Sequence, residues 1–313
     1  MFRHYSEEFG KYQKHLLVNS ETGSEFSVVP QCGALLLSCK IQHFELIDGY
    51  NQPSELEEQA YGKSLLLFPF PNRLNGGQFR FQNKTYSFPI NDPNTGNAIH
   101  GMGFKSPFAV ESVELNDTRA ALTCTHHYDG LNPAFPFPFN VTVQFEMIDN
   151  QFNTVLSIEN CGLLPMPAGL GWHPYFRIAA SIDDCTIQLP ILELVEIDKR
   201  MLPTGSQKKF GNFAFPSSLK NVNLDNCFFV PEQHKPFIAV IDSPNGTLSY
   251  SQQTGHRGFN YVQLFTPTHR KSIAVEPMSC NIDGFNNTQG LQILQPAEQL
   301  TGRCGFQFVK KIS

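Results

Sequence analysis

The sequence is poor in charge: charged residues make up 16% of its 313 residues, against roughly 25% in an average soluble protein. The net charge is −5, and no run of lysine or arginine is longer than two residues. A chain without a basic patch lacks the electrostatic footprint that binds a phosphate backbone. We therefore expect no nucleic-acid partner.

Long apolar runs are also missing. No stretch approaches the roughly 18 consecutive apolar residues of a membrane-spanning helix, and the first residues lack the apolar segment of a secretory signal. These absences predict a cytoplasmic protein without a membrane partner.

Several cofactor and catalytic motifs are absent as well. The eight cysteines are scattered without a Cys-x-x-Cys pair, which argues against a zinc site or a redox pair and predicts reduced, mostly buried thiols. The segment that begins at Gly101 lacks the third glycine of a dinucleotide motif, and Pro107 follows it, so no helix opens for a phosphate. A Gly-x-Ser-x-Gly elbow is missing too. We expect neither a cofactor nor a metal.

The residues that are abundant favour strands. The chain has 28 phenylalanines, and short apolar segments recur between glycine, proline and asparagine. The clearest alternation runs from Val141 to Met147 and resumes at Phe152, on either side of a turn at Asp149 and Asn150. Helix-like stretches are few, and residues 54–60 are one of them. The pattern predicts an all-β protein built as a large antiparallel β-sandwich, with no linker or repeat, and hence a single domain over residues 1–313.

Further strands are expected where glycine, proline and asparagine separate other short apolar segments. Residues 26–47 predict a meander of two or three strands, and the segments on either side of Gln82 and Asn83 predict a hairpin. The remaining expected strands cover residues 185–189, 236–241, 247–251, 261–265, 272–276 and 291–294.

One segment combines the only tryptophan of the chain with a histidine and a proline: residues 171–176. Pro174 biases His173 towards extended geometry. The aromatic residues of the segment are typical of a core, and a lone histidine among them is more often a packed neighbour than a catalytic group. Trp172 and its aromatic neighbours are therefore expected mainly in packing, and a role for His173 depends on other polar residues.

Three such residues stand in turn-rich or extended contexts: Arg73, His100 and Glu276. Glu276 ends an apolar strand, so either it terminates that strand at the surface or its buried carboxylate needs partners and has a raised pKa. Two histidines and a glutamate are compatible with a metal site or with acid/base chemistry. No close ligand pair surrounds them, which favours acid/base chemistry. The adjacent His126 and His127 would point to opposite faces of a strand and are not expected to be ligands.

Taken together, these segments resemble the aldose 1-epimerases, or galactose mutarotases. The motifs occur in the family's order over most of the chain: Pro71-Asn72-Arg73 with Gly76-Gly77 and the Phe79/Tyr86 hairpin, Asn97-Ala98-Ile99-His100-Gly101, Gly171-Trp172-His173-Pro174-Tyr175-Phe176, Leu224-Asp225, and Val275-Glu276-Pro277 with Phe285-Asn286.

The resemblance implies a single large β-sandwich of the galactose mutarotase type, with a sugar in a cleft on one sheet. It implies an aldohexose as the small-molecule partner, no cofactor and no metal, in a monomer or homodimer. The implied roles are a general base, Glu276; a general acid, His173; a second histidine near the ring oxygen, His100; holders of sugar hydroxyls, Arg73 and Asp225; and an additional contact on the strand next to Glu276, Gln263.

Interconversion of anomers opens the sugar ring, so a base must take the proton of the C1 hydroxyl while an acid protonates the ring oxygen. The expected forms are a Glu276 carboxylate, a His173 imidazolium and, beside that cation, an uncharged His100.

Three alternatives stay open. A hexose-6-phosphate 1-epimerase would need a basic cluster at the cleft, for which the candidates besides Arg73 are Lys105, Arg177 and Arg270. A non-catalytic carbohydrate-binding protein could share the fold, although binding alone needs no acid/base pair. An accessory domain of a glycosidase or lyase would require a second catalytic module, which is not attached.

Overall fold

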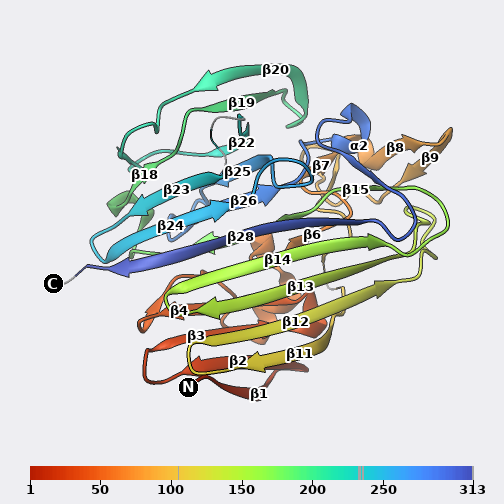
Figure 1. Cartoon of the computed structure of the whole chain (residues 1–313). Helices are drawn as coiled ribbons and strands as arrows, with labels where there is room; N and C mark the ends of the chain where they lie inside the picture. Colours follow the sequence, from red (N-terminus) through yellow and green to blue (C-terminus); the bar gives the residue numbers. More distant parts are fainter. Residues whose placement is uncertain (105, 232–233, 235, 312–313) are drawn as a thin grey trace.

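The structure is a computed structural model that describes residues 1–104, 106–231, 234 and 236–311 (Figure 1). Strands dominate it, and the ladders of its large sheets are antiparallel. A nine-stranded and an eight-stranded sheet pack against a common apolar core, and a five-stranded N-terminal sheet extends it. The predicted large antiparallel β-sandwich is confirmed.

The nine-stranded sheet begins with a regular meander. Along Phe139–Ile148 buried and half-exposed residues alternate without interruption, as expected for a strand with one face in the core. In spatial order its strands are β11 (Ala109–Leu115), β12 (Arg119–Tyr128), β13 (Phe139–Ile148), β14 (Gln151–Asn160), β28 (Gln299–Lys310), β24 (Gly246–Gln252), β23 (Phe237–Asp242), β18 (Thr186–Gln188) and β21 (Ser217–Ser218).

The eight-stranded sheet carries the residues of greatest functional interest. In spatial order its strands are β20 (Pro203–Phe210), β19 (Leu192–Ile197), β22 (Asp225–Phe229), β25 (Tyr261–Phe265), β26 (Ile273–Met278), β16 (Gly171–Trp172) and β6 (Leu66–Leu67), with β17 (Tyr175–Phe176) paired to β26.

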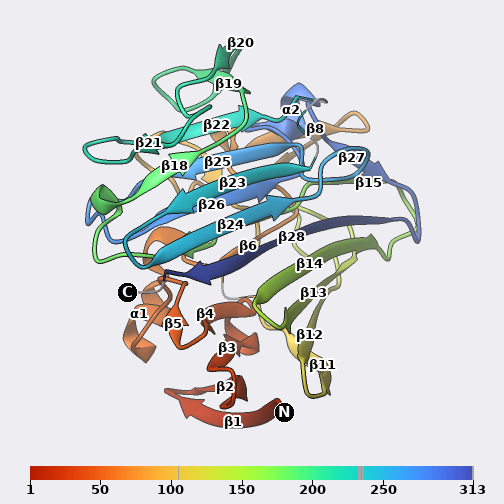
Figure 2. The ribbon, with the colours of Figure 1, turned by 60° about the vertical axis from the view of Figure 1, so that its left-hand side comes forward.

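The N-terminal sheet follows chain order and is formed by β1 (Arg3–Phe9), β2 (Tyr12–Asn19), β3 (Ser24–Val29), β4 (Leu35–Ile41) and β5 (Phe44–Glu45). Strand β1 and the β19–β20 hairpin lie at opposite ends of the molecule (Figure 1 and Figure 2). The other elements include three two-stranded ladders and two short α-helices: β7 (Arg73–Leu74) with β10 (Ala98–Ile99), β8 (Gln78–Phe81) with β9 (Lys84–Ser87), β15 (Met166–Ala168) with β27 (Gln292–Leu294), α1 (Pro53–Glu58) and α2 (Gly284–Asn287).

Aromatic side chains from all three sheets meet in the core. Trp172 of the eight-stranded sheet lies 6.4 Å from Phe145 of the nine-stranded sheet, measured between ring centroids. Phe176 and Phe306 lie 5.1 Å apart across the same core, and Phe26 of the N-terminal sheet contacts Phe152 at 5.3 Å. Truncation of one such buried ring removes about 3–5 kcal/mol of stability. The prediction that Trp172 and its neighbours serve mainly in packing is confirmed for Trp172 and Phe176, which are fully buried.

Most predicted elements are present. The meander, the short helix and the hairpin are confirmed, and Gln82 and Asn83 both have positive φ, as a two-residue turn requires. His126 is buried whereas His127 is exposed, and seven of the eight cysteines are buried.

One predicted boundary is wrong. Strand β26 does not end at Glu276 but continues through Pro277 to Met278. The continuation is possible because Gly171 of β16 has no side chain: a Cβ there would lie 2.9 Å from the carbonyl oxygen of Pro277. Both neighbouring strands can therefore pair at Met278.

Candidate active site

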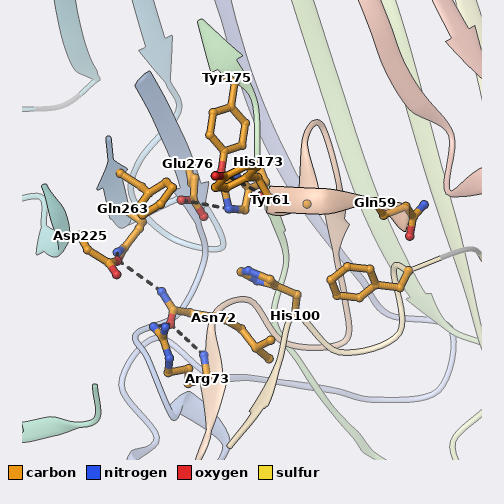
Figure 3. Close-up of a pocket in the computed structure, with 14 residues that line it drawn as sticks. Gln59, Tyr61, Asn72, Arg73, His100, His173, Tyr175, Asp225, Gln263 and Glu276 are labelled. Carbon is orange, nitrogen blue, oxygen red and sulfur yellow. Dashed lines mark hydrogen bonds and ion pairs between the residues drawn. The ribbon is translucent and has the colours of Figure 1, made fainter. Parts of the chain in front are cut away.

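A pocket of about 290 Å³ opens on the face of the eight-stranded sheet that is turned away from the core (Figure 3). Leu264 and Val275 point into the core, so the alternating residues of β25 and β26 point into the pocket. The lining residues are Gln59, Tyr61, Gly62, Asn72, Arg73, Ile99, His100, Phe104, His173, Tyr175, Asp225, Gln263, Phe265 and Glu276.

The register of three paired strands determines where the acidic side chains of the pocket lie. Gln263 of β25 lies directly opposite Glu276 of β26, so their side chains share one face. Asp225, the first residue of β22, lies opposite Phe265 of β25. Phe265 is two residues after Gln263, so Asp225 is on the same face of the sheet as Gln263. Three consecutive strands therefore bring these polar side chains together.

The main chain fixes His173 between β16 and β17. Its N–H donates to the carbonyl oxygen of Leu65 at 2.9 Å, and its own carbonyl oxygen accepts from the N–H of Ser64 at 2.9 Å. The ring of Tyr175 stacks on the imidazole with centroids 4.9 Å apart. Trp172 donates its indole N–H to the carbonyl oxygen of Ser64 and anchors the segment from the core side. The histidine is held from both sides.

The opposite wall comes from the β7–β10 ladder, in which Arg73 pairs with Ile99. His100 follows with a left-handed φ of 63°, and its N–H donates to the carbonyl oxygen of Asn72 at 2.9 Å. Gly101 is required next to it, because a Cβ there would lie 2.2 Å from the carbonyl oxygen of Phe68. His100 thereby reaches His173, with ring centroids 5.4 Å apart.

A chain of hydrogen bonds joins the two walls. Gln263 Nε2 donates to Asp225 Oδ1 at 2.7 Å, and Asn72 Nδ2 donates to Gln263 Oε1 at 3.2 Å. The Asn72 side-chain oxygen in turn accepts from the backbone N–H of Arg73 at 2.9 Å. The Asp225 carboxylate at one end and the backbone N–H of Arg73 at the other determine the orientation of the two side-chain amides between them (Figure 3).

Glu276 and His173 form the central pair. His173 Nε2 lies 3.4 Å from Glu276 Oε1, and their side chains are only 8% and 2% exposed. Burial raises the pKa of Glu276 well above its usual value, and the nearby Asp225 raises it further. Burial lowers the pKa of His173 to about 3. The low dielectric surroundings therefore favour the neutral form of both groups, which differs from the Glu276 carboxylate and the His173 imidazolium expected from the sequence.

The pocket also concentrates polar atoms without partners. Glu276 Oε2, His173 Nδ1 and His100 Nδ1 are buried and have no hydrogen-bond partner within the described chain. Burial, with smaller contributions from His173 and Arg73, lowers the pKa of His100 well below its usual value, which agrees with the expected uncharged form. Unsatisfied buried polar groups are unfavourable, and a ligand in the pocket could provide partners for these three.

All six residues singled out from the sequence line this pocket: Arg73, His100, His173, Asp225, Gln263 and Glu276. The possible phosphate-binding residues do not. Arg270 is bound to Asp183 at 2.6 Å, and Arg177 lines a different cavity. Arg177 directly follows β17 and Arg270 precedes β26, and neither lines the pocket; Lys105 lies outside the described residues.

The sequence did not single out the other eight lining residues as site residues, and four of these have polar side chains: Gln59, Tyr61, Asn72 and Tyr175. Asn72 has a detectable signal, since it precedes Arg73 and asparagine tolerates its left-handed φ of 56°. Tyr175 stands two residues after His173 and could have been inferred from that spacing. Gln59 and Tyr61 belong to a loop that no motif marks.

Within the described residues, no cluster of three histidine, cysteine or acidic side chains is arranged to hold a metal ion. The helices of this part of the chain are all too short or too polar to cross a membrane.

Comparison with known proteins gives a consistent result. A family model for aldose 1-epimerase matches residues 16–307. The uncharacterized Escherichia coli protein YihR is 28% identical over 288 residues, which cover 89% of this chain and 88% of that protein. A galactose mutarotase-like protein from Clostridium acetobutylicum superposes with a TM-score of 0.87 at 20% identity over 99% of both chains. A galactose 1-epimerase from Lactobacillus acidophilus superposes with a TM-score of 0.84 at 16% identity, covering 100% of this chain and 99% of that one. At these identities the structural likeness shows the fold.

Proposed function

The chain belongs to the aldose 1-epimerase family, and we propose that it is a cofactor-independent mutarotase that interconverts the α and β anomers of an aldohexose. The observation that carries the proposal is the contact of a buried carboxyl group with a buried imidazole, 3.4 Å apart, on the floor of the pocket. Binding alone would not require such a pair. Glu276 Oε2 and His173 Nδ1 lack hydrogen-bond partners within the described chain, and the hydroxyl groups of a sugar could supply them.

The contact suits ring opening because the hydroxyl oxygen and the ring oxygen of an aldose are both bonded to C1. In the proposed reaction the Glu276 carboxylate takes the proton of the C1 hydroxyl, and His173 gives a proton to the ring oxygen as its bond to C1 breaks. C1 becomes an aldehyde, the bond from C1 to C2 rotates, and both proton transfers reverse as the ring closes on the other face.

The buried pair also suggests where the acid's proton comes from. Burial keeps the resting pair neutral, with the proton on Glu276, and the contact with His173 gives that proton a path to the imidazole when the sugar is bound. The transfer creates the carboxylate and the imidazolium without changing the net charge of the pair. His100, uncharged, is placed to hydrogen-bond near the ring oxygen, while Arg73, Asp225 and Gln263 hold hydroxyl groups.

The charge of the pocket supports an unphosphorylated sugar. Among its described lining residues Arg73 is the one permanent cation, and it is already paired with Asp92 at 2.9 Å. Asp225 and Glu276 add acidic groups to the same pocket. A 6-phosphate would therefore meet little positive charge, and we favour a neutral aldohexose over the hexose 6-phosphate.

Polarimetry of freshly dissolved α-D-glucose and α-D-galactose, with their 6-phosphates in parallel, tests the proposal. Acceleration by the wild type that is lost in Glu276→Gln and His173→Asn is expected. If no sugar equilibrates faster than in buffer while NMR titration still shows binding, the chain is a carbohydrate-binding protein instead. Faster equilibration of the 6-phosphates than of the free hexoses would reverse the substrate assignment.

A further inference from the structure

Arg73 is held by a carboxylate that does not itself line the pocket. Its Nε donates to Asp92 Oδ2 at 2.9 Å, and the two side chains are 13% and 14% exposed. Its Nη1 lies 3.4 Å from Asn72 Oδ1, a weak contact. A guanidinium has five N–H donors, so a partner that occupies Nε alone leaves the two Nη groups available.

Asp92 is in turn held by its own loop. Thr95 Oγ1 donates to Asp92 Oδ2 at 2.6 Å, and the backbone N–H groups of Gly96 and Asn97 donate to the Asp92 carbonyl oxygen at 2.9 and 3.2 Å. Although burial alone would raise it, these side-chain hydrogen bonds from Thr95 and Arg73 keep the pKa of Asp92 below its usual value. The carboxylate is thus charged and fixed at neutral pH.

A second arginine ties this loop to the far edge of the sheet. Arg200, in the turn between β19 and β20, donates to the carbonyl oxygens of Thr95 and Gly96, both at 3.2 Å, and to Asn97 Oδ1 at 2.9 Å. Asn97 Nδ2 returns a hydrogen bond to the carbonyl oxygen of Arg200 at 2.9 Å. The loop therefore cannot shift without breaking several partly buried polar contacts.

We propose that Asp92 is a positioning residue, which holds the Arg73 guanidinium side-on through Nε so that its Nη groups face the hydroxyls of the sugar. The inference rests on the proposed function, since it assigns Arg73 to the substrate. Asp92 orients the arginine and also neutralises it, so that a buried cation is tolerated beside the uncharged His100.

The test separates this role from a purely structural ion pair. In Asp92→Asn we expect the KM for the accepted hexose to rise about tenfold, because about one charged hydrogen bond to the sugar is lost. The value of kcat should change little. Arg73→Ala should raise KM at least as much, and the double variant should be no worse than Arg73→Ala, because Asp92 acts through Arg73. Additive effects, or an unchanged KM in Asp92→Asn, would overturn the proposal.

Two further variants keep the result interpretable. Asp183→Asn breaks another aspartate–arginine pair, with Arg270, away from the pocket, and should lower stability without changing KM. Thr95→Ala removes one hydrogen bond to Asp92, so it should raise KM less than Asp92→Asn does. If Asp92→Asn folds poorly, Thr95→Ala decides the test, and an unchanged KM in that variant contradicts the inference.

Calorimetric titration with D-galactose gives a readout that does not depend on turnover. A wild type that binds the sugar without epimerising it rejects the proposed activity and leaves the Asp92 test intact, with about tenfold weaker binding expected in Asp92→Asn. A wild type that neither binds nor turns over an aldose overturns both.

Discussion

Two glutamates, one half-buried in the N-terminal sheet and one buried in the eight-stranded sheet, show opposite uses of a carboxyl group. Glu45 of β5 accepts hydrogen bonds from Ser38 Oγ at 2.5 Å and from the backbone N–H groups of Cys39 and Ile47 at 2.9 and 3.1 Å. Among the residues that the structure describes, the Glu276 carboxyl group of β26 has one polar partner, His173 Nε2 at 3.4 Å, and its Oε2 has no hydrogen-bond partner.

Burial raises the pKa of both carboxyl groups, so the pKa direction alone does not distinguish them. The difference lies in their partners. The fold itself satisfies Glu45, which therefore joins β4, β5 and the following segment, whereas Glu276 is left to be satisfied by something that enters the pocket. A perturbed carboxyl group that lacks partners indicates a functional site more strongly than one that has them.

Replacing Glu276 gives the largest expected effect on activity. Glu276→Gln keeps the shape but removes the base, so mutarotation should fall by about 10²–10⁴-fold. Because the variant also removes a buried ionisable group, its free energy of unfolding at pH 8 should be no lower than that of the wild type. Polarimetry and thermal unfolding measure the two quantities; activity within threefold of the wild type would remove Glu276 from the mechanism.

The raised pKa of Glu276 predicts a pH dependence of stability with a definite sign. A carboxyl group whose pKa is higher in the folded than in the unfolded state favours folding below the unfolded pKa, and this contribution is lost as the pH rises through the folded pKa. The wild type should therefore lose stability relative to Glu276→Gln between about pH 4.5 and that higher pKa, by roughly 1.4 kcal/mol for each pH unit that separates the folded from the unfolded pKa. Subtracting the two unfolding curves cancels the other groups; parallel curves would contradict the prediction.

The sequence was informative about the residues that stand in short, punctuated segments. His173 stood out because Pro174 restricts its geometry. Gln263 was expected only through the family resemblance, and its position opposite Glu276 comes from the pairing of β25 with β26. Asn72 binds Gln263 across 191 residues of sequence, a proximity that no local pattern encodes. Strands β1 and β2 escaped prediction because β1 is mostly exposed and β2 mostly half-buried, and neither has the apolar alternation that marks a strand.

Glu45→Gln should show the reverse behaviour of Glu276→Gln. Its amide group can no longer accept all three hydrogen bonds, so the free energy of unfolding should fall by about 1–3 kcal/mol. Mutarotation per folded molecule should stay unchanged, because Glu45 does not line the active-site pocket. Chemical denaturation and polarimetry on the same preparation check both statements, and a large loss of activity at full stability would erase the contrast between the two glutamates.

The smallest expected effect comes from removing one partner of Glu45. Ser38→Ala deletes the hydroxyl donor at 2.5 Å but leaves the two backbone donors in place, so the carboxylate stays partly satisfied. The free energy of unfolding should fall by about 1 kcal/mol, less than in Glu45→Gln. The loss should also shrink in acid, because a protonated Glu45 needs fewer donors than the carboxylate. Urea denaturation at pH 4 and pH 8 measures this difference, and a loss that is equal at both pH values would show that Ser38 contributes through packing and not through its hydrogen bond to Glu45.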